Sequence, residues 1–214
     1  MKILFEDDSI IVCIKPVGIQ SQSDSTGKES MITILSERTG GEIFPLHRLD
    51  RDVGGVMVYA KTKSAAAKLS RDIAEHNFKK EYLALVHGRP KEDKGEMRDL
   101  LFKDSRKNKS FVVDRMRKGV KEALLSYEVI TSADGLSVAR VLLHTGRTHQ
   151  IRVQFASRKM PLAGDRKYGG KDDFNEIGLW SHRISFTHPK TSEKIIFTAI
   201  PENNIKDYIK EITL

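Results

Sequence analysis

The chain has 214 residues, which is long enough to bury a sizeable core but too short for a long array of domains. Hydrophobic residues make up 39% and charged residues 31%, so the composition excludes a wholly disordered chain. A formal net charge of +8 favours a polyanionic partner such as a phosphate backbone, although many basic proteins bind no such partner.

The distribution of apolar residues and cysteine excludes further classes. No apolar run approaches the roughly 20 residues that a membrane span requires, and charges at residues 6–8 interrupt the region where a signal peptide would be apolar. We therefore expect a cytoplasmic protein that does not interact with membranes. The single cysteine, Cys13, lies in an apolar run and is expected to be a buried, inert thiol. Neither cysteine nor histidine shows metal-ligand spacing, so no metal site is predicted.

The N-terminal part of the chain predicts short strands and a helix. Apolar residues 3–5 and 10–14 flank an acidic turn and indicate two strands. Residues 20–29 carry no apolar side chain, which predicts a mobile loop, and a short helix should follow that ends near Gly40. The apolar run at 55–60 predicts a buried strand.

The rest of the chain continues this alternation. A second helix is expected to be capped by Ser64 and to carry Ala66, Leu69 and Ile73 on its apolar face. Strands are predicted at 82–86, 123–130, 136–144 and 194–199, and helices near 148–158 and 202–212. The pattern favours an α+β fold with a mixed sheet flanked by helices, and residues 1–214 are expected to form a single domain.

A basic segment lies at residues 103–121. Its cationic residues are Lys103, Arg106, Lys107, Lys109, Arg115, Arg117, Lys118 and Lys121. One interpretation is a solvated hairpin arm. The other is a surface that contacts RNA phosphates, with Lys107, Lys109, Arg115 and Lys118 as candidate contacts.

A dense polar cluster occupies residues 145–152, directly after an apolar run. A strand that ends where a helix begins is a usual place for an anion site, because free backbone N–H groups point outward there. On the expected helix Ile151 and Phe155 share one face, and His149 and Arg152 share another. Helix capping and surface charge are the alternative explanation for this cluster.

A second cluster, residues 47–52, places Asp50 between arginines. The aspartate could form a purely structural ion pair. Alternatively, a neighbouring guanidinium would keep it ionised as a nucleophile in a partly dry cleft. The chain contains no Gly-x-Ser-x-Gly elbow, no phosphate-binding loop and no dinucleotide fingerprint, which leaves these two clusters as the candidates for chemistry.

Segments spread over nearly the whole chain resemble, in order, the RluA-type RNA pseudouridine synthases. They are Glu-Asp-Asp-x-Ile-Ile-Val-x-x-Lys-Pro-x-Gly (6–18), His-Arg-Leu-Asp (47–50), Phe-Lys-Lys-x-Tyr-x-Ala-x-Val-x-Gly (78–88), Thr-Gly-Arg-Thr-His-Gln-Ile-Arg (145–152), Gly-Asp-x-x-Tyr-Gly (164–169) and Leu-Trp-Ser-His-Arg-Ile-x-Phe-x-His-Pro (179–189). The resemblance implies the pseudouridine synthase fold, with a mostly antiparallel sheet and a central active-site cleft. It also implies isomerisation of uridine in ribosomal or transfer RNA, not DNA, with no cofactor.

The resemblance also implies roles for individual residues. Asp50 matches the nucleophile, Tyr82 the tyrosine that stacks on the base, and Arg152 the arginine that pairs with the aspartate. Arg48 is expected to fill the space that the flipped base vacates. The other residues expected to bind substrate are His47, Arg147, His149, Gln150, Leu179 and Ile184; the last two would form an apolar wall of the pocket, with core packing as the alternative.

One departure from the family pattern follows the aspartate. The family usually has Thr-Ser-Gly where this chain has Val53-Gly54-Gly55, so two hydroxyls that could bond to the backbone near the nucleophile are missing. This departure and the basic segment motivate the alternative of a non-catalytic RNA-binding protein on the same scaffold. A hydrolase or nuclease that uses Asp50 and His47 is a further alternative. We expect a monomer without an S4-like RNA-binding module; the target uridines cannot be read from the sequence.

Overall fold

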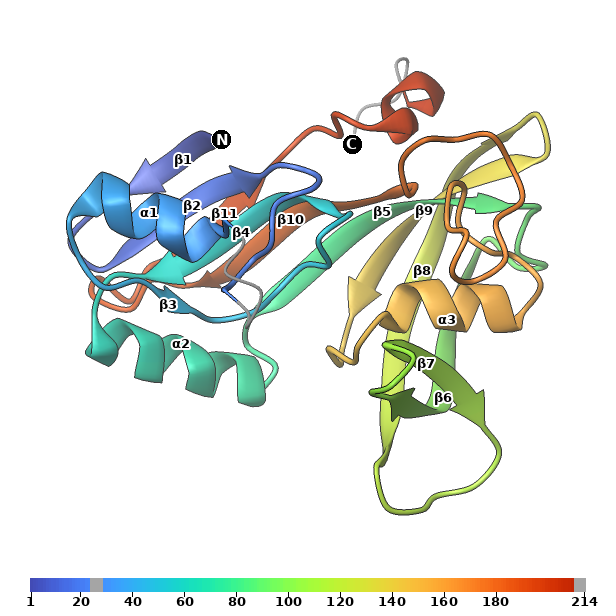
Figure 1. Cartoon of the computed structure of the whole chain (residues 1–214), viewed down its shortest axis with the longest axis horizontal. Helices are drawn as coiled ribbons and strands as arrows, with labels where there is room; N and C mark the ends of the chain where they lie inside the picture. The colour runs from blue at the N-terminus through green and yellow to red at the C-terminus, as the bar shows by residue number, and fades with distance from the viewer. Residues whose placement is uncertain (24–28, 210–214) are drawn as a thin grey trace. The chain divides into compact units, whose positions relative to one another are not determined.

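The computed structural model describes residues 1–23 and 29–209, which divide into two compact units (Figure 1). Unit 1 comprises Met1–Lys80 and Ser181–Ile200, and unit 2 comprises Glu81–Trp180 and the chain from Pro201 onward. Two strands, β5 (Lys79–His87) and β10 (Leu179–Thr187), contribute residues to both units. The single domain predicted over residues 1–214 stays a prediction, since one domain can contain two such units.

Unit 1 is built on a sheet with the strand order β1-β2-β4-β10. Its other strands are β1 (Lys2–Glu6), β2 (Ile10–Lys15), β3 (Phe44–Pro45), β4 (Gly54–Ala60) and β11 (Lys194–Thr198); β3 pairs with β4, and β11 with β10. Every residue of β2 and β4 is buried, which confirms the strands predicted from their apolar runs. Cys13 is fully buried, as predicted, and burial raises the pKa of its thiol to about 12.

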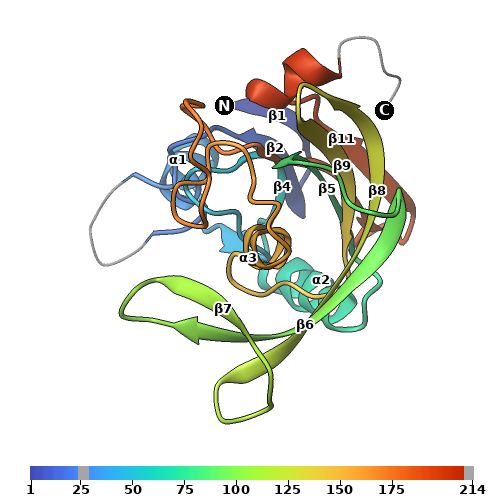
Figure 2. The same cartoon turned by 90° about the vertical axis from the view of Figure 1, so that its right-hand side faces the viewer.

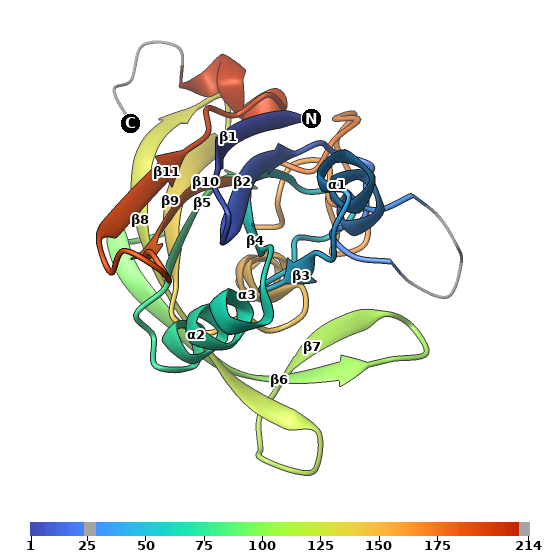
Figure 3. The ribbon, with the colours of Figure 1, turned by 90° about the vertical axis from the view of Figure 1, so that its left-hand side faces the viewer.

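Two helices belong to unit 1. Helix α1 (Met31–Thr39) begins at a capping box of Ser30 and Thr33 and ends at Gly40, which adopts the left-handed conformation. Helix α2 (Lys63–Ala74) runs alongside β3 and β4 (Figure 3).

The predicted cap of α2 is wrong. Thr62, not Ser64, has the extended backbone of an N-cap residue, and its side chain accepts a hydrogen bond from Ala65 N. Ser64 lies exposed in the first turn. The earlier start also changes the apolar face, because Ala65 is buried beside Leu69 while Ala66 and Ile73 are only partly buried.

Unit 2 contains the strand order β5-β9-β8-β6-β7. The further elements are β6 (Lys94–Asp104), β7 (Lys109–Val113), β8 (Val120–Ala133), β9 (Leu136–Leu143), α3 (Gln150–Ser157) and the 3-10 helix η1 (Asn204–Tyr208). Figure 2 shows β9, β8 and β6 curving around α3. All strand pairs whose register is described in either unit are antiparallel. The predicted helix at 202–212 is a shorter 3-10 helix within the described chain, and residues 210–212 lie outside it.

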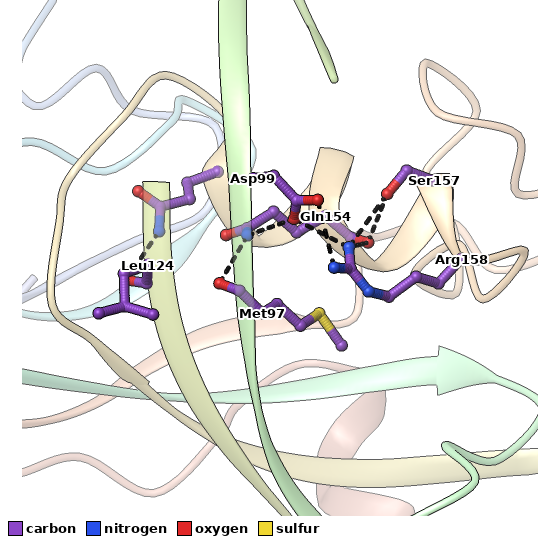
Figure 4. A network of polar contacts seen from close by, with 7 residues as sticks. Met97, Asp99, Leu124, Gln154, Ser157 and Arg158 are labelled. Atoms are coloured by element: carbon purple, nitrogen blue, oxygen red, sulfur yellow. Dashed lines mark hydrogen bonds and ion pairs between the residues drawn. The ribbon is translucent and has the colours of Figure 1, made fainter. Parts of the chain in front are cut away.

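Polar side chains of Gln154, which is fully buried, and of the exposed Arg158 bind helix α3 and its C-terminal end to the sheet (Figure 4). The amide Nε2 of Gln154 donates to the backbone oxygen of Met97 at 2.9 Å and to Oδ2 of Asp99 at 2.6 Å. Arg158 binds both carboxylate oxygens of Asp99. All residues of α3 from Gln150 to Phe155 are buried, so both faces predicted for this helix are enclosed over these residues.

Parts of the predicted loop at 20–29 are ordered by packing. Residues 24–28 lie outside the described residues, but Gln20 pairs with Ser30 and Ser21 is only 3% exposed. Within residues 1–23 and 29–209, no helix is long and apolar enough to cross a membrane.

Candidate functional site

The predicted nucleophile, Asp50, lies in a tight turn of unit 1 that leads into β4. The backbone N–H of Val53 donates to the carbonyl oxygen of Asp50 at 3.1 Å. Leu49 and Val53 are 6% and 1% exposed, so the turn is anchored in the core on both sides of the aspartate. Asp50 itself is partly buried, whereas the neighbouring Arg48 and Arg51 are exposed. The turn therefore presents a carboxylate from a fixed backbone.

The buried side chain of Lys15 binds the backbone of this turn. The ammonium of Lys15, at the end of β2, donates to the carbonyl oxygens of Pro16 at 2.8 Å, Ile19 at 2.6 Å and Arg51 at 3.1 Å. Its side chain is inaccessible to solvent, and this burial lowers the pKa of Lys15 to about 8, against the opposing effect of the Asp52 and Asp50 carboxylates. Lys15 thus joins the 16–19 loop to the Asp50 turn and places a positive charge near the predicted nucleophile. Lys15 belongs to the motif at residues 6–18, but no role was predicted for it from the sequence.

Ser21 supplies a hydroxyl to the same turn. Its Oγ accepts from the backbone N–H of Leu49 at 2.9 Å and donates to the Leu49 carbonyl oxygen at 2.8 Å. The hydroxyl of Tyr59, on β4, donates to the backbone oxygen of Ser21 at 3.0 Å. These bonds show how the turn is held where the family's threonine and serine are replaced by Val53 and Gly54.

The ring of His47 packs against an aromatic side chain. Its ring centroid lies 5.6 Å from that of Phe78, and Phe78 stacks on Phe186 at 5.0 Å with an interplanar angle of 4°. Burial, with a smaller effect from the charge of Lys80, lowers the pKa of His47 to about 3, so the imidazole is neutral at physiological pH. Its two ring nitrogens have no hydrogen-bond partner among the described residues. A neutral, enclosed imidazole disfavours the hydrolase hypothesis, in which His47 would exchange protons with solvent.

In unit 2 the dominant feature is a buried arginine–aspartate fork. Nε and Nη2 of Arg152 bind Oδ2 and Oδ1 of Asp165 at 2.7 and 2.8 Å, and the two residues are 4% and 0% exposed. Such a bidentate pair fixes the plane of the guanidinium. Gly164, at φ +72°, is required beside it, because a Cβ there would lie 2.1 Å from the carbonyl oxygen of Glu176. The alternative explanation by surface charge is thus wrong for Arg152, because its side chain is buried. The pairing of Arg152 with Asp50 stays a prediction.

The segment that leads into α3 is held by its own side chains. Oε1 of Gln150 accepts from the backbone N–H of Arg147 at 3.0 Å and from Oγ1 of Thr145 at 2.8 Å. Nε of Arg147 donates to the carbonyl oxygen of Glu122 at 2.7 Å. His149 is the N-cap residue, in the left-handed conformation at φ 54° and without a side-chain capping bond. These contacts order the segment that precedes α3, but none of them is a side-chain cap of the helix; the binding of substrate by Gln150 and Arg147 stays a prediction.

Three further predicted site residues lie in the interior. Tyr82 on β5 is 6% exposed and Leu179 on β10 is 5% exposed, both in unit 2, while Ile184 in unit 1 is fully buried. The burial of Leu179 and Ile184 is consistent with the alternative that both residues pack in the core. The stacking role of Tyr82 and the pocket wall formed by Leu179 and Ile184 stay predictions.

The basic segment forms the β6–β7 hairpin and the loop that leads into β8; we call residues 103–121 the basic arm. Lys107, Arg115 and Lys118 are exposed. Lys109 is half-buried, donates to the carbonyl oxygen of Lys167 at 2.6 Å and lies over the ring of Tyr168. The arm is therefore a hairpin, as one interpretation had it, and its outward charges remain available for phosphates.

Comparison with solved structures first defines the class of fold. The human protein titled RNA Pseudouridylate Synthase Domain Containing 1 superposes with a TM-score of 0.78 at 22% identity, covering 94% of this chain and 83% of that one. The human Domain Containing 4 protein gives the same TM-score at 21% identity, covering 94% and 89%. The fold is thus the pseudouridine synthase fold, as predicted.

Sequence comparison then gives the family. The model described as RNA pseudouridylate synthase matches residues 9–157. An uncharacterized RNA pseudouridine synthase of Bacillus subtilis, YhcT, is 32% identical over 93% of this chain and 68% of its own length. Ribosomal large subunit pseudouridine synthase C of Buchnera aphidicola (subsp. Baizongia pistaciae) is 33% identical over 98% and 70%. The chain belongs to the RluA-type RNA pseudouridylate synthase family and is an RNA pseudouridine synthase, an isomerase.

Proposed function

We propose that this synthase isomerises specific uridines in ribosomal or transfer RNA, with Asp50 as its nucleophile. The observation that carries the proposal is the Asp50 turn, in which a carboxylate is presented from a backbone that Lys15 and Ser21 hold in place. A relative whose name assigns it to the large ribosomal subunit supports ribosomal RNA as the substrate to test first. We further propose that the protein acts as a monomer in the cytoplasm.

The reaction rearranges the nucleotide without adding atoms. The bond between uracil N1 and ribose C1′ breaks, the uracil turns, and its C5 bonds to C1′; C5 then loses its proton and N1 gains one. Asp50 can begin the reaction at C1′, at uracil C6, or by removing a ribose proton, and each route requires an ionised carboxylate. Lys15 lies near enough to Asp50 for the aspartate charge to act against the lowering of the lysine's pKa.

The remaining site residues bind and orient the nucleotide in this proposal. Uridine must leave its stack, at a cost of a few kcal/mol, and the exposed side chain of Arg48 can occupy the vacated space. Tyr82 gives the detached uracil an aromatic surface on which to turn. In this proposal Arg152, whose guanidinium plane is fixed by Asp165, is the arginine that pairs with the nucleophilic aspartate.

The proposal is tested by Asp50→Asn, which keeps the shape of the side chain but removes its charge. We expect pseudouridine formation to fall below about a thousandth of the wild-type rate, with folding and RNA affinity retained. Pseudouridine mapping of total RNA from cells with the gene deleted, restored, or restored with this substitution identifies the sites at the same time. Asp8→Asn, at an exposed carboxylate of the same unit, is the control and should restore every site. Sites restored by Asp50→Asn would refute the nucleophile.

The basic arm is tested through the salt dependence of RNA binding. Replacement of Lys107, Arg115 and Lys118 by glutamine should weaken binding and reduce the slope of log affinity against log salt by about 0.7–0.9 for each phosphate that is no longer neutralised. The matched control replaces Lys2, Lys63 and Lys194, exposed cations of unit 1 that change net charge equally. An equal reduction of the slope in both triple variants would show that the arm contributes only to net charge.

A further inference from the structure

The hydroxyl of Tyr168 joins two segments that are far apart in the sequence. It accepts a hydrogen bond from the backbone N–H of Ser110 in β7 at 2.8 Å and lies 2.9 Å from Nδ1 of His149, the N-cap residue of α3. With its oxygen accepting from Ser110, the phenol can donate its own proton to Nδ1, which keeps the His149 proton on Nε2. Burial raises the pKa of Tyr168, so that proton is retained at neutral pH.

The ring of Tyr168 contacts the side chains of two cations. Nζ of Lys109 in the basic arm lies 4.9 Å from the ring centroid, and the guanidinium carbon of Arg152 lies 5.2 Å from it. Both distances fall within the range of cation–π attraction. The backbone of Tyr168 also binds the fork, because its N–H donates to Oδ1 of Asp165 at 3.3 Å and to the Asp165 carbonyl oxygen at 3.1 Å.

The outer edge of the arm depends on these contacts. In the sheet β7 is the last strand and pairs only with β6 among the described strands. Its other edge is held by Tyr168 through the Ser110 N–H and by the Ser110 hydroxyl, which donates to the carbonyl oxygen of Thr148 at 2.6 Å. A displacement of the arm must therefore move Tyr168 or break its bonds, and Tyr168 contacts both ends of the His149–Arg152 segment.

We propose that Tyr168 is a positioning residue that couples the basic arm to Arg152, so that RNA bound on the arm orders the N-terminal turn of α3 for the reaction. This inference rests on the proposed function only for its catalytic consequence; the coupling itself is a property of unit 2. Tyr168 is 9% exposed, which suits a residue that acts through its neighbours rather than by touching the nucleotide. The role divides between the hydroxyl, which binds the arm and His149, and the ring, which contacts the two cations.

Hydrogen exchange measured with and without protein-free ribosomal RNA tests the coupling independently of turnover. In the wild type, RNA should slow amide exchange both in β7 and at residues 149–153. In Tyr168→Phe, which keeps the ring but removes the hydroxyl, RNA should still protect β7, whereas the added protection at 149–153 should disappear. Tyr127→Phe is the matched control, because it removes a hydroxyl that donates only to the Glu92 carbonyl oxygen at the surface of the same unit. Undiminished protection at 149–153 in Tyr168→Phe would overturn the coupling.

Kinetics separate positioning from general stability. For Tyr168→Phe we expect kcat to fall about tenfold, because a small misplacement of catalytic groups is costly, while KM changes less than about twofold, because the cations of the arm remain. If Tyr168→Phe only destabilised the fold, the amount of active enzyme would fall. Any other variant of equal stability would then show the same loss of activity. An unchanged kcat without the protection at 149–153 would overturn the link to catalysis. If the wild type modifies no RNA, the proposed function fails, but the exchange experiment still decides the coupling.

Discussion

The Asp50 turn in unit 1 and the Arg152 fork in unit 2 hold charged residues of the candidate site in opposite ways. Asp50 is positioned through its backbone, because the groups that fix the turn bind carbonyl oxygens and N–H groups of Asp50's neighbours. Arg152 is positioned through its side chain, which Asp165 binds with two oxygens. Asp50 is partly buried, while Arg152 is almost wholly enclosed.

This difference determines which substitutions each region tolerates. A backbone support acts whatever side chain the supported residue carries, so changes at Lys15 or Ser21 should loosen the turn without removing any reactive group. A side-chain support is specific to its partner: loss of Asp165 would remove a counter-charge from a buried guanidinium that stays protonated in proteins. The two regions should therefore respond very differently to the removal of one supporting group.

The largest effect is expected for Asp165→Asn. This substitution takes from the buried Arg152 the carboxylate that binds it with two oxygens, and breaking such a pair costs about 3–5 kcal/mol. Urea unfolding should show a loss of this size in the free energy of unfolding, together with loss of pseudouridine formation. Asp99→Asn is the control, because Asp99 also forms an arginine fork in unit 2, with Arg158, whose side chain is 34% exposed, and it accepts a bond from Gln154; its loss should cost about 1–2 kcal/mol.

A double variant separates charge from fold. In Arg152→Met with Asp165→Asn, both charges of the fork are removed, so stability should recover most of the loss seen in Asp165→Asn alone. Activity should not return, because the guanidinium is gone. A double variant no more stable than the single one would show that the fork matters for packing rather than for charge compensation.

A smaller effect is expected for Lys15→Met, the corresponding test of the Asp50 turn. Two carbonyl oxygens, those of Pro16 and Ile19, lose the ammonium, while that of Arg51 keeps its bond from the Gly18 N–H. We expect a loss of about 2–3 kcal/mol at pH 7 and a reduced kcat as the turn loosens. Stability equal to that of the wild type would show that the lysine is not a support.

The pKa of Lys15 adds a pH signature to this variant. The folded-state pKa of about 8 lies below the ordinary value of 10.5, so between these values the folded protein binds fewer protons than the unfolded chain. Its contribution to stability must therefore rise with pH across this window, by up to about 3 kcal/mol. Lys15→Met lacks this group, so its deficit relative to the wild type should widen from pH 8 to 10.5. Urea unfolding at several pH values measures the difference.

The sequence predicted the elements whose apolar residues are continuous. β2 and β4 were predicted from their apolar runs, and in the structure every residue in them is buried. The end of α1 was predicted from Gly40, because glycine readily adopts the left-handed conformation that it has there. β6 and β7 were missed as strands because their charged and apolar residues alternate irregularly in a hairpin exposed along much of its length. The cap of α2 was misplaced by two residues because Thr62 and Ser64 are equally suitable chemically, and only the backbone conformation distinguishes them.

The candidate site was predictable as a set of residues but not as a structure. The family motifs include Asp50 and Arg152, and they also contain Lys15, Asp165 and Tyr168, yet no pattern within a motif says which of its members contact one another. The Arg152 fork joins residues 13 positions apart, and Ser21 reaches Leu49 over 28 positions. Such partners depend on tertiary packing, which is why the supports of both charged residues were missed while the charged residues themselves were found.

The smallest effect is expected for Ser21→Ala, which tests whether the turn depends on one hydroxyl. The change leaves the buried N–H and carbonyl oxygen of Leu49 without this partner, at a cost of about 1–2 kcal/mol. Ser21→Thr keeps the hydroxyl and should retain more activity than Ser21→Ala. Adding Val53→Thr, the family's usual residue, to Ser21→Ala then asks whether a hydroxyl on the other side of Asp50 can replace the missing one. Recovered turnover would show that the two positions are interchangeable supports; no recovery would mean that the turn requires its hydroxyl at Leu49.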